Sequence, residues 1–233
     1  MPHTTTFENP QIVALLKEDI EFSEIYKIFT HTATHHEVLD RKTYELIQLA
    51  ISSSPTHLSK DATAYHMAQA LKAGATKEEV AEVLKVVSIL GVHTCAVGVP
   101  IVMKYLPQAE TPLTPEQQQL KNRFIETMGY WNDFRDDLLR FDTAYFEQYF
   151  EFLTLPMRRG ILTPKLIEFI YIAIDASTTH LFDKGIDVHI KGAIEKGATK
   201  EEIMAVIQIT AGQGFHTLLE MLPLLDNVVE NLE

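Results

Sequence analysis

Two glutamates lie in strongly apolar stretches of the sequence. Glu168 is the one charged residue of residues 166–174, and Glu45 lies in the companion stretch, residues 44–51. A helix that is apolar on nearly every face is buried, and a buried carboxylate is costly unless it is paired. Desolvation raises the pKa of a carboxyl group, so each glutamate is a candidate general acid or base near neutral pH. The alternative is a structural glutamate that bonds an arginine, a histidine or a helix end.

Two histidines follow each glutamate at the same spacing. His57 and His66 are nine residues apart, as are His180 and His189. Nine residues of a continuous helix make about 2.5 turns and would put the two side chains on opposite faces. They can converge only where the first histidine precedes the helix, and Pro55 favours such a break. The candidate catalytic residues are therefore Glu45, His57, His66, Glu168, His180 and His189.

A third histidine recurs in a Gly-x-His-Thr segment. His93 and His216 each follow a glycine by two residues, and we expect them to cap or bond a helix break there. Three recurring histidines and a glutamate would also suit zinc or iron(II). The spacing matches no compact motif such as His-x-x-x-His. The favoured expectation is therefore a site with neither metal nor cofactor, with a metal site as the weaker alternative.

The candidate residues belong to an internal repeat. Residues 74–79 (Gly-Ala-Thr-Lys-Glu-Glu) recur as residues 197–202, an offset of 123 positions. Over residues 39–102, 23 of 64 positions are identical at that offset, far more than chance would give. Such self-similarity indicates a duplicated structural unit. We place the first repeat at residues 1–110 and the second at residues 111–233, with a proline-rich seam between them.

Helix signals run through both repeats. Thr76 and Glu79 form a capping box, which Thr199 and Glu202 repeat. A glycine two residues before each box fits the end of the preceding helix. Thr114, followed by a proline, predicts the start of a long helix toward residue 140. The sequence therefore predicts an all-α fold.

The motifs together resemble the carboxymuconolactone decarboxylase and alkylhydroperoxidase D family. Residues 39–51 look like the opening helix of that domain, and His66 with residues 74–80 looks like its central helix and turn. The second repeat matches over residues 162–176 and 189–203. The resemblance implies two tandem alkylhydroperoxidase D-like helical units. It also implies a homo-oligomer, a trimer that imitates the hexamer of single-unit members.

The thiol peroxidase branch of this family uses a Cys-x-x-Cys motif, with a glutamate and a histidine as proton relay. Glu45 and His66, or Glu168 and His189, match that glutamate and histidine. Ser59 and Ala62 occupy the two cysteine positions in the first repeat, and Phe182 and Gly185 occupy them in the second. Disulfide cycling needs a thiolate and a resolving thiol, and the chain has one cysteine, Cys95. Peroxidase activity is therefore disfavoured.

The remaining branch decarboxylates a lactone acid by proton transfer without a cofactor. Arg41 is a candidate to hold a substrate carboxylate, although its counterpart is Pro164. Our leading hypothesis is a cofactor-free acid–base enzyme, a lyase, that acts on a small organic carboxylate or lactone. The alternative is a non-enzymatic scaffold or binding protein of the family. We expect the second repeat, with its more apolar sequence around Glu168, to hold the better site.

Composition limits the partners. The chain has 20 Lys and Arg against 32 Asp and Glu, a net charge of −12, which disfavours nucleic acid. One cysteine allows no internal disulfide and fits a reducing compartment. Residues 1–4 lack the pattern of a signal peptide, and we expect no apolar run near the ~20 residues needed to span a bilayer. The expectation is a cytoplasmic protein that binds a small molecule.

Overall fold

The computed structural model describes residues 14, 17–32, 38–109 and 111–232. The described residues form helices joined by turns, with no strand among them, which confirms the predicted all-α fold. Residues 1–4, for which the sequence predicts no signal peptide, lie outside the described residues.

The chain divides into two compact units. Unit 1 comprises Met1–Ser88 and Ile161–Glu233, and unit 2 comprises Ile89–Gly160. The elements of unit 1 are α2 (Ile20–Thr32), α3 (Arg41–Ser53), α4 (Lys60–Lys72), α5 (Lys77–Ser88), α10 (Pro164–Ala176), α11 (Asp183–Glu195), α12 (Lys200–Ala211), the 3-10 turn η3 (Gly212–Phe215) and α13 (His216–Glu230). Those of unit 2 are the 3-10 turn η2 (Ile89–Val92), α6 (His93–Tyr105), α7 (Pro115–Met128), α8 (Phe134–Phe141) and α9 (Thr143–Arg159).

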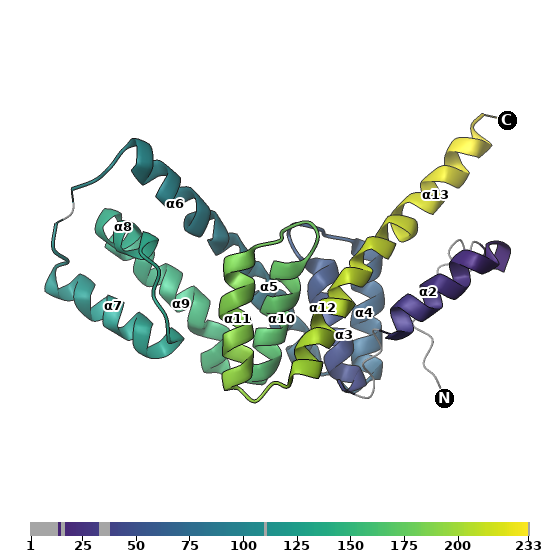
Figure 1. Ribbon diagram of the computed structural model, residues 1–233, viewed down its shortest axis with the longest axis horizontal. Coiled ribbons are helices and arrows are strands. Elements are labelled where there is room, and N and C mark those ends of the chain that lie inside the picture. The colour runs from purple at the N-terminus through teal and green to yellow at the C-terminus, as the bar shows by residue number, and fades with distance from the viewer. Residues whose placement is uncertain (1–13, 15–16, 33–37, 110, 233) are drawn as a thin grey trace. The chain divides into compact units, whose positions relative to one another are not determined.

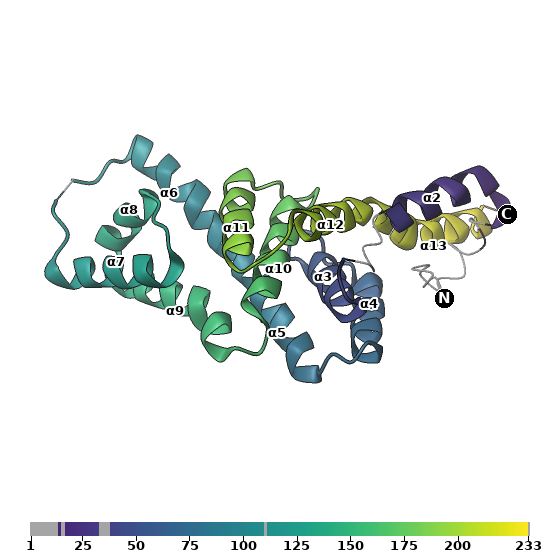
Figure 2. The same ribbon diagram turned by 60° about the horizontal axis from the view of Figure 1, so that its bottom comes forward.

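The two glutamate-bearing helices form the centre of unit 1. Helix α3 packs against α4, helix α10 packs against α11 and α12, and α3 and α10 contact each other (Figure 1). Figure 2 shows the same helices side by side from a second direction. Their shared core is aliphatic and fully buried, and includes Leu46, Ile47, Leu49, Ile51, Ile170, Ile172 and Ile174. Unit 1 therefore takes its core from both sequence repeats, and the repeat boundary near residue 110 stays a prediction.

The local signals that begin helices are confirmed at both capping boxes. The Glu79 backbone N–H donates to Thr76 Oγ1 at 3.0 Å, and the Glu202 N–H donates to Thr199 Oγ1 at 3.1 Å. Gly74 has φ 93°, a left-handed conformation that lets the preceding helix end there. These signals fix where α5 and α12 start.

The long helix predicted from Thr114 is wrong. Thr114 caps α7 as expected, but α7 ends at Met128 because Gly129 adopts φ 76° and stops it. A separate helix, α8, then begins at Phe134.

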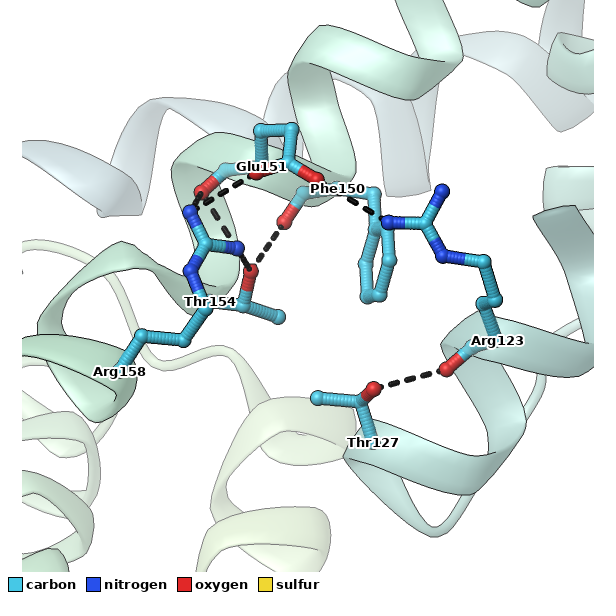
Figure 3. A network of polar contacts seen from close by, with 6 residues as sticks. All are labelled: Arg123, Thr127, Phe150, Glu151, Thr154 and Arg158. Atoms are coloured by element: carbon cyan, nitrogen blue, oxygen red, sulfur yellow. Dashed lines mark hydrogen bonds and ion pairs between the residues drawn. The ribbon is translucent and has the colours of Figure 1, made fainter.

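Unit 2 is held together by aromatic and charged side chains. The Arg135 guanidinium is buried 4.7 Å from the Phe124 ring and 4.6 Å from the Phe134 ring. Between α7 and α9, Glu151 bridges Arg123, at 3.3 Å, and Arg158, at 2.8 Å (Figure 3). Exposed ion pairs of this kind contribute about 0–1 kcal/mol, so the buried cation is the stronger organiser of unit 2.

The expectation that no apolar run could span a bilayer is wrong. Lys77–Tyr105, 29 residues long, is apolar and long enough to cross a membrane, and residues 86–103 contain no Asp, Glu, Lys or Arg. Helix α5, the first part of this run, packs on α3 and α10, with Val83, Val86 and Val87 buried. The core helix of a soluble protein passes the same test of length and composition, so the run is weak support for a membrane span.

Candidate functional site

A buried glutamate–histidine pair joins α3 and α4. Glu45 is fully buried, and its Oε2 lies 2.7 Å from Nδ1 of His66, which is 3% exposed. Asp40 accepts the Thr43 N–H and caps α3, so Glu45 lies on the second turn, facing α4. An ionised carboxylate only accepts, so Nδ1–H of His66 is the donor, and Nε2 is the nitrogen left to exchange a proton.

Arg41 completes this pair one helical turn before Glu45. Its Nη2 forms an ion pair with Glu45 Oε1, whereas Glu45 Oε2 bonds His66 Nδ1, so each carboxylate oxygen faces a nitrogen. The second terminal nitrogen, Nη1, is buried and has no hydrogen-bond acceptor among the described residues. A buried donor left unpaired costs free energy, which an incoming acceptor would recover.

These residues line a small cavity in unit 1. Its volume is about 30 Å³, room for roughly two water molecules. Its polar lining is Arg41, Glu45, Gln48, His66 and His216, and its other lining residues are Tyr26, Tyr44, Tyr65, Phe215 and Gly212. Burial raises the pKa of Tyr26 to about 12 and raises that of Tyr44 further, so both phenols remain donors at neutral pH. The first repeat supplies most of this wall, and the second repeat supplies residues 212, 215 and 216.

His57 meets the cavity through His216. His57 Nε2 lies 2.6 Å from His216 Nδ1, and the two rings stack with centroids 4.9 Å apart. Burial, with the charges of His57 and His66, lowers the pKa of His216 to about 3. Burial also lowers the pKa of His57, against the opposing charge of Glu220. Both rings are therefore neutral at pH 7.

The predicted break before the second histidine of the pair is confirmed. Helix α4 begins at Lys60, capped by Ser59, so His57 precedes it and lies in the turn between α3 and α4. Leu58 has φ 52°, and its counterpart Leu181 has φ 48°. A left-handed non-glycine residue costs about 1–2 kcal/mol, so the two equivalent turns carry the same backbone strain.

His216 bonds the helix break as expected, because its backbone N–H donates to the carbonyls of Gln213 and Gly214 in η3. Its ring also bonds His57, a histidine of the other repeat. Sequence reasoning missed this second contact, because the two residues are 159 positions apart. The one sequence signal for His216 was that it and His93, which lie at the repeat offset, each follow a glycine by two residues.

The second repeat pairs its glutamate differently. Glu168 Oε2 lies 2.8 Å from His189 Nδ1, and Glu168 Oε1 lies 2.9 Å from Lys196 Nζ. Burial raises the pKa of Glu168, but the hydrogen bonds and charges of His189 and Lys196 outweigh it and lower the pKa below its usual value. The expected upward shift is therefore wrong for Glu168. Lys196, which sequence reasoning missed, replaces Ala73 of the first repeat.

The expectation of drier surroundings for Glu168 is also wrong. Its side chain is 12% exposed, against 1% for Glu45. The apolar residues beside Glu168 in sequence face the core, whereas its own carboxylate extends to a lysine near the surface. The first repeat therefore holds the more enclosed acid.

A further buried acid, Asp175, lies between the histidines of the second repeat. Its two oxygens are each 4.0 Å from a ring nitrogen, Nε2 of His180 and Nε2 of His189. Burial raises the pKa of Asp175 to about 8. A Cβ on Gly185 would overlap this carboxyl, so the missing side chain makes room for it. The first repeat has Ser52 and Ala62 at these two positions.

The structure thus pairs four of the six predicted site residues as glutamate–histidine pairs: Glu45 with His66, and Glu168 with His189. His57 lies next to His216, and His180 lies beside Asp175. The first pair is the chemically more complete site, because it lines a cavity together with an arginine donor.

Comparison with known proteins agrees with this architecture. The model of the carboxymuconolactone decarboxylase family matches residues 21–102 and 143–220, one segment in each repeat. The crystal structure of a "putative gamma-carboxymuconolactone decarboxylase subunit" from Burkholderia xenovorans LB400 is similar to the chain, with 37% sequence identity and a TM-score of 0.90. That match covers 97% of this chain and 92% of the other.

The curated proteins contain no match to the chain. The two family segments contain Glu45 and His66, and Glu168 and His189, together with the helices that carry them. By sequence and by fold, the chain belongs to the carboxymuconolactone decarboxylase family.

Proposed function

We propose that the chain is a cofactor-free acid–base enzyme that acts on a small organic carboxylate or lactone at the Arg41–Glu45–His66 cavity. The observation that carries the proposal is the buried Nη1 of Arg41, a donor with no acceptor among the described residues, on the wall that also holds a glutamate–histidine pair. An anionic oxygen of a substrate would satisfy that donor. The similar Burkholderia protein, named for a gamma-carboxymuconolactone decarboxylase, supports decarboxylation of such a lactone as the reaction.

The roles follow from the chemistry of decarboxylation. The bond from the carboxylate to its carbon breaks, CO₂ leaves, and the electron pair passes into the remaining conjugated lactone. A proton must then be added to carbon, so each turnover consumes one proton. His66 Nε2 would deliver it, and Glu45 would stabilise the imidazolium form. Arg41 would bind the substrate oxygen that carries negative charge, where a preorganised donor is most effective.

We assign the activity to the first repeat. In the second repeat, Lys196 forms an ion pair with Glu168 Oε1, and His189 forms a hydrogen bond with Glu168 Oε2. This arrangement is a satisfied ion pair and needs no substrate to complete it. We propose that Glu168 and His189 have a structural role.

A non-enzymatic binding protein is the competing function. The small cavity favours it, because about 30 Å³ admits water but a lactone acid only after the walls move. A turnover assay distinguishes the enzyme from the binding protein, because a binding protein would bind the lactone and leave it unchanged.

We also propose a cytoplasmic homo-oligomer, a trimer. The support is the apolar surface of α13, where Met221, Leu224, Leu225, Val228 and Val229 are exposed. Single exposed apolar residues are normal, but a row of them on one helix indicates an association surface. Light scattering on the purified protein tests the trimer, and a monomer at all concentrations contradicts it.

The function is tested with the purified protein and gamma-carboxymuconolactone, alongside small lactones that lack the carboxylate. Loss of the carboxylated lactone and release of CO₂ are followed together. We expect turnover of the carboxylated compound and a loss of about 10²- to 10⁴-fold in His66→Gln. Full activity in His66→Gln, or neither turnover nor binding of any compound, overturns the proposal.

A further inference from the structure

We propose that His57 and His216 form a path for protons between the cavity and solvent, so that the second repeat supplies part of the first repeat's site. This inference rests on the proposed function, because it is proton uptake at each turnover that requires a path. His57 and His216 are positioning and transfer residues here, distinct from the group that protonates the substrate.

The need for a path follows from burial. His66 is 3% exposed and Glu45 is fully buried, so neither exchanges a proton with bulk water directly. A group that gives up its proton in each cycle must be reprotonated before the next. His216 shares the cavity with His66, and a water molecule fits in the space that they line.

The geometry provides the rest of the route. His216 is buried at the cavity wall, whereas His57 is only half-buried, in the turn before α4. The separation of 2.6 Å between His57 Nε2 and His216 Nδ1 is within reach of direct proton transfer. His216 therefore contacts the cavity, His57 reaches the surface, and a hydrogen bond joins the two rings.

Burial keeps both rings in the neutral form that can relay a proton, because it lowers the pKa of His57 and of His216. Glu220 on α13, which bonds Ser59 at 2.5 Å, opposes this shift at His57, whereas His66 on α4 adds to it at His216. A neutral imidazole has one donor and one acceptor nitrogen, so it can receive a proton at one and release a proton from the other. A permanently charged ring would have no acceptor nitrogen.

Each step forms one N–H or O–H bond and breaks another. A proton from solvent adds to His57 Nδ1, and the Nε2 proton of His57 passes to His216 Nδ1. His216 then releases its Nε2 proton to a cavity water, which reprotonates His66. Return of both rings to the starting tautomers completes the cycle, and no other reactant is needed.

The test compares turnover of gamma-carboxymuconolactone in wild-type protein, His57→Ala and His57→Gln, at low and high concentrations of imidazole buffer. Glutamine can still donate to His216 but cannot relay a proton, so His57→Gln controls for loss of the hydrogen bond. We expect both variants to lose roughly ten- to a hundredfold in kcat at low buffer, with little change in KM. Added imidazole should restore kcat in both, because it carries the proton in place of His57.

Wild-type kcat in both variants, or a loss that imidazole does not restore, overturns the path. Glu45→Gln distinguishes the two failures: if it is inactive while the His57 variants are fully active, only the path is wrong. Nitrogen-15 spectra of the imidazoles need no substrate. We expect coupling across the hydrogen bond between His57 and His216, and its absence contradicts the path whatever the substrate.

Discussion

His57 Nε2 lies 2.6 Å from His216 Nδ1, although the two residues are 159 positions apart and belong to different repeats. This contact makes the site of the first repeat a product of both. The glutamate, the arginine and two histidines come from residues 41–66, and the third histidine comes from the start of α13. A single repeat would lack one wall of the cavity.

The two cations beside the glutamates should differ in function. Arg41→Lys keeps a charge beside Glu45 but loses the second terminal nitrogen, so we expect kcat/KM for the lactone acid to fall on the order of tenfold or more. Lys196→Met should leave kcat/KM unchanged and cost less than about 1 kcal/mol of stability, because the lysine is a third exposed. Steady-state kinetics and urea unfolding of both variants check this. Equal kinetic losses would contradict the assignment of activity to the first repeat.

Gly185 and Asp175 should depend on each other. In Gly185→Ala the new methyl group overlaps the Asp175 carboxyl, and we expect a loss of roughly 1–3 kcal/mol in the free energy of unfolding. Asp175→Ser, the residue of the first repeat, should remove the overlap, so that alanine at 185 is tolerated in the double variant. Urea unfolding of the two single variants and the double variant gives the coupling. Additive losses would show that the two positions are independent.

The buried Asp175 should make stability depend on pH. Burial raises the pKa of its carboxyl from 3.8 to about 8, so the native state holds a proton that the unfolded state has lost between those values. The stability that this proton provides is complete below about pH 4 and is lost as the pH rises toward 8. Asp175→Asn cannot ionise, so its advantage in Tm over wild type should grow across this range. An advantage that is constant with pH would contradict the raised pKa.

The sequence predicts those parts of the fold that depend on local signals. The capping residues Thr76 and Thr199 fix the starts of α5 and α12, and the break before α4 places His57 outside that helix. The apolar stretch around Glu45 correctly indicates burial, and the resemblance to the family indicates His66 as its partner. Each of these inferences uses neighbours in sequence or a motif that the chain shares with the family.

The parts that sequence could not predict depend on packing between distant segments. The contact of His216 with His57 depends on the packing of α13 against α4, and no spacing of residues in the sequence indicates that packing. Lys196 follows its partner Glu168 by 28 residues in the sequence, whereas Arg41 precedes its partner Glu45 by one helical turn. The apolar residues beside Glu168 in the sequence therefore led to a wrong prediction, that its carboxylate is the more buried of the two.

The central claim is that the buried Glu45, and not its copy Glu168, supports proton transfer. The most direct measurement is kcat/KM for gamma-carboxymuconolactone in Glu45→Gln and Glu168→Gln, two variants with the same isosteric change at equivalent positions. We predict a loss of at least about 10²-fold in Glu45→Gln and a value near that of wild type in Glu168→Gln. Equal losses in the two variants, or wild-type activity in Glu45→Gln, would contradict the account.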